Sequence, residues 1–140
     1  MTLVTTSRKA APDLRALARG LAFAVGGRYL ARGKTGLREL VTLDTTFFLF
    51  SYEPDGLQLR WFVDAEPAAS WRVTAREERH REGPIVRGLL ASDAVRSALG
   101  SRLETTPLED GWDLGFDGHQ RLQYRLRLAP AGGAAGADVA

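Results

Sequence analysis

The chain has 140 residues, 44% of them hydrophobic and 26% charged, with a formal net charge of +2 and no cysteine. This length allows one domain with a real hydrophobic core, the composition is ordinary for a soluble globular protein, and the lack of cysteine excludes disulfides and thiol chemistry. Without a run of about 18 apolar residues or a basic segment leading into an apolar one, neither a membrane span nor a secretory signal is expected, so the expected location is the cytoplasm.

The chain begins with a pattern that predicts a strand and then a helix. Residues 2–6, TLVTT, are rich in β-branched side chains and predict a short strand. Residues 12–25 carry leucine and alanine at helical spacing and begin with Pro12, which suits the first turn of a helix. Gly26 and Gly27 follow directly, and this pair predicts the end of the helix.

The rest of the first half predicts strands around a second helix. Residues 28–32, RYLAR, predict a short strand, residues 33–36, GKTG, a turn, and residues 37–43, LRELVTL, a short helix. Residues 45–52, TTFFLFSY, are apolar on both alternating faces, which predicts a central strand covered on both sides. Residues 57–63, LQLRWFV, follow the turn EPDG and predict an antiparallel return of the chain.

The second half repeats this order more faintly. Residues 71–76 alternate as a strand, and residues 77–84, EERHREGP, predict a charged loop whose glutamates and arginines neutralise one another. Residues 91–103 predict a helix with Ser92 as its N-cap. The segments WDLGF and RLQYRLRL flank the turn DGHQ within residues 112–128, which predicts a last hairpin.

This order of elements predicts one α/β domain over residues 1–129. The domain consists of two similar halves, at about residues 1–66 and about residues 70–129, because a strand, a helix and a hairpin recur in each. Residues 130–140 hold mostly alanine and glycine, with no side chain that could anchor them on a core, so we expect a disordered tail there.

Positive charge is concentrated near one end of the sequence. Residues 1–40 carry eight basic and two acidic side chains, a net charge of +6. Residues 41–70 carry one basic and five acidic side chains, a net charge of −4. Clustered positive charge is typical of proteins that bind a polyanion, although a solvated surface rich in arginine would show the same pattern.

The tripeptide Gly33-Lys34-Thr35 looks like the end of a phosphate-binding P-loop. In a P-loop, four residues separate the first glycine from the Gly-Lys pair, because the loop wraps a phosphate with successive N–H groups. That glycine would have to stand at position 28, which is Arg28, and the predicted strand lies inside the interval instead of before it. The spacing therefore argues against a nucleotide site.

Two motifs around the first predicted helix resemble the start of the Brix domain of archaeal proteins. They are LVTTSRK at residues 3–9 and YLARGKTGLREL at residues 29–40. The resemblance implies an α/β fold of two similar halves, each resembling the anticodon-binding domain of class II aminoacyl-tRNA synthetases. It also implies a ribosome-biogenesis factor that binds ribosomal RNA or its precursor and assists rRNA processing or subunit assembly. Other ribosome-assembly proteins are further candidate partners, and we expect no DNA, membrane, cofactor or metal.

Two short polar segments, one after each of the first two predicted strands, carry the candidate RNA-binding residues. These are Ser7, Arg8, Lys9, Arg32, Gly33 and Lys34. If the two strands are parallel neighbours, both segments lie at one edge of the sheet, where open α/β sheets bind ligands. Arginine holds phosphate with two hydrogen bonds and stacks on unpaired bases, and glycine allows a close approach of the backbone. Candidates for secondary RNA contacts are Arg15, Arg19 and Arg38.

Other interpretations of these residues stay open. Ser7 could instead cap the first helix, and Arg15 and Arg19 could form a solvated helix face. One face of the last predicted strand is basic, and it is either a second RNA surface or an exposed hairpin face. Its residues are Arg121, Arg125 and Arg127.

Three functions fit the sequence. The first is an RNA-binding factor for ribosome assembly, the second is an interaction module that docks an acidic protein without contacting RNA, and the third is an enzyme that acts on a phosphorylated substrate. Catalysis has the least support, because His80 and His119 stand far apart and the chain has no helical pair of histidines and no Gly-x-Ser-x-Gly motif.

We expect no magnesium-dependent ATP binding, because the glycine spacing of a P-loop is missing. Calorimetric titration of the whole chain with ATP and Mg²⁺ should give no heat of stoichiometric binding, and Lys34→Ala should behave in the same way. Stoichiometric binding that requires magnesium and is lost in Lys34→Ala would contradict this prediction and restore the P-loop.

Overall fold

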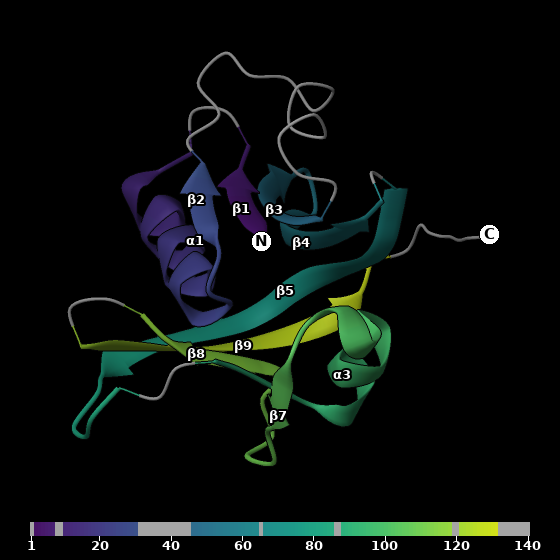
Figure 1. Cartoon of the computed structure of the whole chain (residues 1–140). Coiled ribbons are helices and arrows are strands. Elements are labelled where there is room, and N and C mark those ends of the chain that lie inside the picture. The colour runs from purple at the N-terminus through teal and green to yellow at the C-terminus, as the bar shows by residue number, and fades with distance from the viewer. Residues whose placement is uncertain are drawn as a thin grey trace.

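The structure is a computed structural model that describes residues 2–7, 10–30, 46–64, 66–85, 88–118 and 121–131. Within these residues, nine strands form one curled sheet, which two α-helices and a short 3-10 helix accompany (Figure 1). In chain order the elements are β1 (Leu3–Thr6), α1 (Pro12–Ala24), β2 (Arg28–Leu30), β3 (Phe47–Glu53), β4 (Gly56–Val63), β5 (Glu66–His80), β6 (Leu89–Ala91), α3 (Asp93–Leu99), η1 (Gly100–Arg102), β7 (Thr105–Pro107), β8 (Leu114–Asp117) and β9 (Leu122–Pro130).

The sheet has the strand order β2-β1-β3-β4-β5-β9-β8-β6-β7. Strand β1 pairs in parallel with both β2 and β3, whereas β3, β4, β5, β9 and β8 pair antiparallel in turn. The long strand β5 pairs with β4 near its start and with β9 along the rest of its length, so it joins both halves into one sheet (Figure 1). A single domain of mixed α and β structure is therefore confirmed.

The strand order of the first half recurs in the second. The order β2-β1-β3-β4 on one side of β5 corresponds to β7-β6-β8-β9 on the other. One pairing differs, because β1 and β3 are parallel whereas β6 and β8 are antiparallel. Residues 108–113, which link β7 to β8, are too few for the crossover of about a dozen residues that a parallel return needs. The expected likeness of each half to the anticodon-binding domain of aminoacyl-tRNA synthetases is not confirmed.

Both helices pack against one face of the sheet. A single core cluster includes Leu14 and Leu21 of α1, Val95 of α3, and Phe48 and Phe50 of β3. The alternate residues of β3 face the other way and form a second buried cluster, which contains Leu3, Phe47, Leu49 and Phe62. The prediction that this strand is covered on both faces is therefore confirmed.

Several predicted boundaries are confirmed and one is wrong. Helix α1 begins at Pro12, and the side chain of Ser92 caps α3 by accepting a hydrogen bond from the backbone N–H of Val95. The predicted charged loop at residues 77–84 is wrong in its first half, because β5 continues to His80. The cause is the long-range pairing with β9, which places Glu77 opposite Arg125 and so makes a charged strand favourable.

Other predictions fall outside the described residues. These include the turn at residues 33–36, the helix at residues 37–43 and all but the start of the tail. Strand β9 runs to Pro130, and the backbone N–H of Ala131 donates to the carbonyl of Ser70 at 3.1 Å.

Helix α1 approaches the β8–β9 hairpin through glycines. A Cβ atom on Gly20 would lie 2.9 Å from the ring of Tyr124, and one on Gly118 would lie 3.3 Å from the Cα of Gly20. Tyr124 is buried and packs its ring at 5.3 Å from that of Phe116. A helix of the first half is thus seated directly on strands of the second half.

The turn after α1 brings β2 against β1. Gly26 adopts a left-handed conformation with φ 68° and ends the helix, as predicted. At Gly27 the backbone passes so close to Thr2 that a Cβ atom would overlap the Thr2 carbonyl, to which the N–H of Arg28 donates at 3.1 Å. Only glycine therefore allows this entry into β2.

We expect Gly27→Ala to lower the free energy of unfolding by more than about 2 kcal/mol, because backbone atoms cannot move aside as a flexible side chain can. Chemical denaturation measures the change. The matched control is Gly83→Ala, since a Cβ there has no neighbour within 4 Å. Equal stability of the two variants would contradict the close contact at Thr2.

Candidate nucleic-acid interface

The carboxyl ends of β1 and β2 lie at the same edge of the sheet. The two strands are parallel neighbours in the register Leu3 to Arg28, Val4 to Tyr29 and Thr5 to Leu30. The sequence hypothesis required two parallel neighbouring strands, and this condition is thus confirmed.

Hydrogen bonds hold this edge together. The hydroxyl of Thr5, which is fully buried, donates to the carbonyl of Leu30 at 2.6 Å, close to the end of β2. Ser7 follows β1, and its backbone N–H donates to the carbonyl of Phe50 at 2.8 Å, so three strands meet at this edge. The side chain of Ser7 is half-buried at the start of the segment.

The structure describes three of the nine predicted site residues, namely Ser7, Arg15 and Arg19. The other six lie outside the described residues: Arg8, Lys9, Arg32, Gly33, Lys34 and Arg38. The alternative that Ser7 caps the first helix is wrong, because the N-cap is Ala11 and no side chain caps it.

The first turn of α1 contains an acidic side chain. Asp13 lies in the first turn and forms an ion pair with Arg76 of β5, with 2.7 Å between Oδ2 and the guanidinium nitrogen. The hydrogen bond from Arg76 holds the pKa of Asp13 below its ordinary value, and the N–H of Leu14 adds to this effect. The helix end is therefore partly neutralised, so an anion at this edge depends on basic side chains more than on the helix dipole.

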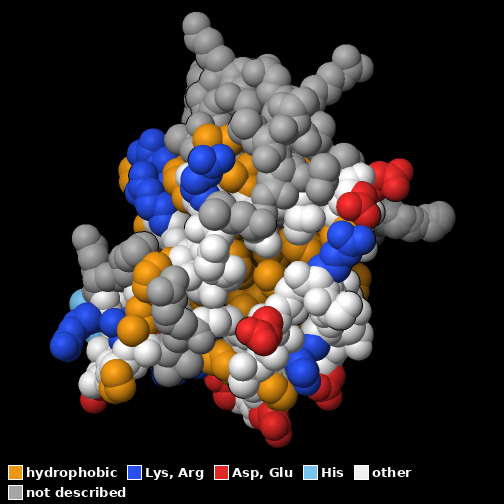
Figure 2. All heavy atoms as spheres, viewed as in Figure 1, with side chains coloured by type: hydrophobic (Ala, Val, Ile, Leu, Met, Phe, Trp, Pro, Cys, Tyr) orange, Lys and Arg blue, Asp and Glu red, His pale blue; other side chains and the backbone are white. Residues whose placement is uncertain are grey.

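Arg15 and Arg19 lie one turn apart on the exposed side of α1, next to β2. Figure 2 shows arginine side chains gathered over α1 and β2. Arg19 is not merely solvated, because its guanidinium lies over the ring of Tyr29 at 5.2 Å from the ring centroid.

A shallow groove of about 330 Å³ lies between the end of α1 and β2. The residues that shape it include Arg19, Phe23, Gly26, Gly27, Arg28 and Tyr29. Arg28 and Tyr29 were missed as site residues from the sequence. A signal was present, because Arg19 and Arg28 stand on either side of the helix-ending Gly26-Gly27, which brings β2 back along α1.

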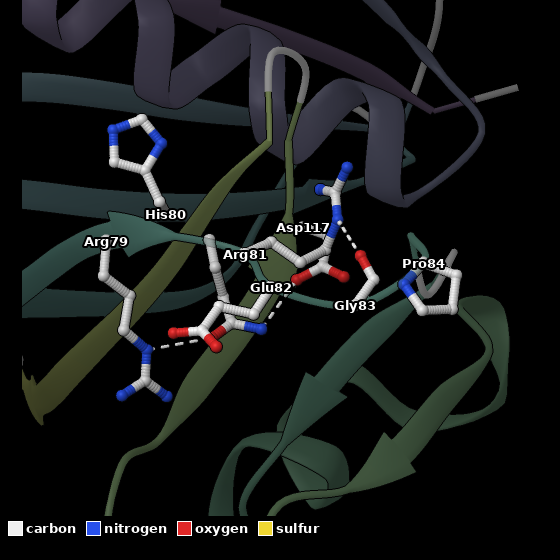
Figure 3. Close-up of a pocket in the computed structure, with 8 residues that line it drawn as sticks. Arg79, His80, Arg81, Glu82, Gly83, Pro84 and Asp117 are labelled. Carbon is white, nitrogen blue, oxygen red and sulfur yellow. Dashed lines mark hydrogen bonds between the residues drawn. The ribbon is translucent and has the colours of Figure 1, made fainter.

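A second cavity of about 510 Å³ lies where β5 ends beside the β8–β9 hairpin (Figure 3). Its arginines bind groups of the same chain: Arg79 donates to Gln123 at 2.9 Å and pairs with Glu77 at 3.5 Å. Arg81 donates to the carbonyls of Gly83 and Gly118. The predicted neutralisation of this charged segment is thereby confirmed for Glu77 and Arg79.

The predicted basic face of β9 is only partly exposed. Arg125 is 7% exposed, lies over Gly115 of β8 and pairs with Asp110 at 3.1 Å. Arg127 lies over the ring of Trp112, 4.9 Å from its centroid. The interpretation of this face as plainly exposed is therefore wrong at Arg125, because a glycine on the neighbouring strand leaves room for its side chain.

Among the described residues, no group of three or more His, Cys, Asp or Glu side chains could hold a metal ion. In the same part of the chain, neither α-helix combines the length and the apolar character needed to cross a membrane.

Known structures share this fold. Mil, an archaeal Imp4-like protein, aligns with a TM-score of 0.62 and 14% identity, over 92% of this chain and 99% of Mil. A probable ribosomal biogenesis protein from Aeropyrum pernix K1 aligns with a TM-score of 0.61 and 17% identity, over 94% of this chain and 96% of that protein. A scan against protein-family models finds no match, and a search of curated protein sequences finds none either.

The chain therefore has the fold of the archaeal Imp4-like proteins, which contain a Brix domain. The resemblance predicted from two sequence motifs is confirmed at the level of the fold.

We expect the ion pair of Asp110 and Arg125 to contribute to stability near neutral pH and to be lost in acid. Burial raises the pKa of Asp110, but the N–H of Trp112 and the guanidinium of Arg125 outweigh this effect and hold it below the ordinary value. A carboxyl with a lowered pKa in the folded state stabilises above its ordinary pKa, and this contribution disappears as the pH falls.

Thermal melts between about pH 5 and about pH 2 check this expectation. Wild type should lose more stability over this range than Asp110→Asn, by at most about 1 kcal/mol, because Asp110 is 42% exposed. Glu109→Gln, a change at the neighbouring exposed carboxylate, serves as control and should follow wild type. Parallel curves for wild type and Asp110→Asn would contradict the role of the pair.

Proposed function

We propose that this protein is a ribosome-biogenesis factor that binds ribosomal RNA or its precursor and assists rRNA processing or subunit assembly in the cytoplasm. The shared fold supports the role, since one structural neighbour is described as Imp4-like and the other as a probable ribosomal biogenesis protein. The proposal includes no catalytic step and no cofactor.

The observation that carries the proposal is the shared edge of β1 and β2. The parallel register places the end of β1 beside Leu30, the last residue of β2. Arg8, Lys9, Arg32, Gly33 and Lys34 follow these two strand ends closely in the sequence, and the proposal is that their four positive charges act together. Such a concentration favours the closely spaced phosphates of RNA.

The exposed face of α1 supports the same conclusion. Arg15 and Arg19 lie on this face and extend the positive charge from the strand edge along the helix. Among the described residues of α1, Asp13 is the one acidic side chain, and it forms an ion pair with Arg76. An RNA backbone that follows α1 to the strand edge would thus meet mainly positive side chains.

The double variant Arg8→Ala/Lys34→Ala should weaken RNA binding by more than tenfold and leave folding intact, since each lost charged contact costs about 1–3 kcal/mol. Fluorescence anisotropy with a precursor-rRNA fragment measures the affinity, and a thermal melt measures folding. The salt dependence of the affinity should also become shallower, by about one unit of slope per lost phosphate contact.

The matched control is Arg72→Ala/Arg102→Ala, which removes two exposed arginines from β5 and η1. This control should bind RNA almost as tightly as wild type. Unchanged affinity in the Arg8→Ala/Lys34→Ala variant, with an unchanged melting temperature, would contradict the proposed interface. Equal losses of RNA affinity in both double variants would show only a general electrostatic attraction between basic side chains and RNA.

A further inference from the structure

The groove between the end of α1 and β2 has the properties of a base site more than those of a phosphate site. We propose that it takes one unpaired RNA base, stacked on the guanidinium of Arg19, so that the protein prefers single-stranded to duplex RNA. This inference rests on the RNA binding proposed above and specifies the form of the RNA.

The stack of Arg19 on Tyr29 supplies the platform. The guanidinium lies over the Tyr29 ring at 5.2 Å from its centroid, while the side chain of Arg19 as a whole is exposed. One face of the planar group is therefore occupied by the ring, and the other remains accessible. A guanidinium plane in this situation is a common surface on which proteins stack unpaired bases.

The walls of the groove fit a flat ring of limited size. Phe23 contributes apolar surface, and Gly26 and Gly27 contribute backbone without side chains. The volume of about 330 Å³ lies at the lower end of the range for small-ligand sites. A single base can enter a space of this kind, whereas a duplex cannot.

The groove combines two exposed arginines, Arg19 and Arg28, with the carboxyl end of a helix. The last turn of α1 contains no basic side chain, and the carboxyl end of a helix carries a partial negative charge on its carbonyl oxygens. Three of these carbonyls, those of Leu21, Ala22 and Phe23, already accept hydrogen bonds from the backbone N–H groups of the turn that follows, so the planar base is held by stacking and not by the helix end. Arg28, which is exposed at the start of β2, also lines the groove and supplies a positive group for the phosphate of the same nucleotide.

The position of the groove agrees with the proposed RNA path. Arg15 lies one turn before Arg19, about 6 Å along the helix, in the direction of the start of α1. An RNA strand whose backbone follows these arginines could place a base on Arg19. In a duplex both faces of each base are already stacked, so this contact requires an unpaired nucleotide.

The test compares two RNA probes on the full chain by fluorescence anisotropy. One is a single strand of about 12 nucleotides with 2-aminopurine at one position, and the other is a duplex of the same length. Arg19→Lys keeps the positive charge but removes the planar group, and Tyr29→Leu removes the ring beneath it. Arg72→Lys, at an exposed position of β5, is the matched control.

We expect wild type to bind the single strand more tightly than the duplex and to quench the 2-aminopurine. Arg19→Lys and Tyr29→Leu should weaken single-strand binding by about five- to tenfold, which is within the range for losing one stacked base. The duplex affinity and the salt dependence should stay as in wild type, because no charge is lost. Arg72→Lys should change nothing.

The same experiment separates a wrong base site from a wrong proposed function. If wild type binds neither probe, the proposed function is wrong, and this inference falls with it. If wild type binds RNA but prefers the duplex, or if Arg19→Lys keeps full single-strand affinity, the function stands and the base site is overturned. A thermal melt shows whether the Tyr29→Leu variant is folded. If it is not, the single-strand affinity of Arg19→Lys alone tests the base site.

Discussion

The parallel pairing of β1 with β2 is the constraint on which the candidate interface depends. At one end of the pair, the backbone at Gly27 lies against the Thr2 carbonyl, which accepts a hydrogen bond from the N–H of Arg28 at 3.1 Å. At the other end, the Thr5 hydroxyl donates to the Leu30 carbonyl at 2.6 Å. With both ends fixed, the two strands end side by side at one edge of the sheet.

The second half of the chain supports this arrangement through its contacts with α1. Helix α1 lies on the β8–β9 hairpin at the contact of Gly20 with Gly118 and Tyr124, and Asp13 is bound to Arg76 of β5. The helix that carries Arg15 and Arg19 is thus held by both halves of the sheet. Rigid support of this kind keeps the spacing between the strand edge and the groove constant, which is what a site for a stacked base needs.

The sequence predicted those features that depend on neighbouring residues. The end of α1 at Gly26, the cap at Ser92 and the apolar β3 follow from local patterns, and the structure confirms them. The two Brix-like motifs also predicted the fold, although the overall identity to the structural neighbours is only 14% and 17%. Local spacing thus retains information on the fold where overall similarity has been lost.

Features that depend on distant partners could not be predicted. Residues 77–80 predict a charged loop because the sequence does not show their pairing with β9. Arg125 is predicted to be exposed because the sequence does not show that it lies over Gly115 and pairs with Asp110. The groove at Tyr29 likewise exists only because β2 returns along α1. For the six predicted site residues outside the described part of the chain, the structure confirms the placement of the strands before them, while their contacts remain a prediction.

Crosslinking in cells, followed by sequencing of the attached RNA, tests the central claim most directly. We expect strong enrichment of precursor ribosomal RNA, with crosslinked sites in its unpaired segments. An even distribution over all cellular RNA would contradict a role in ribosome biogenesis and leave only a general affinity of basic side chains for phosphate.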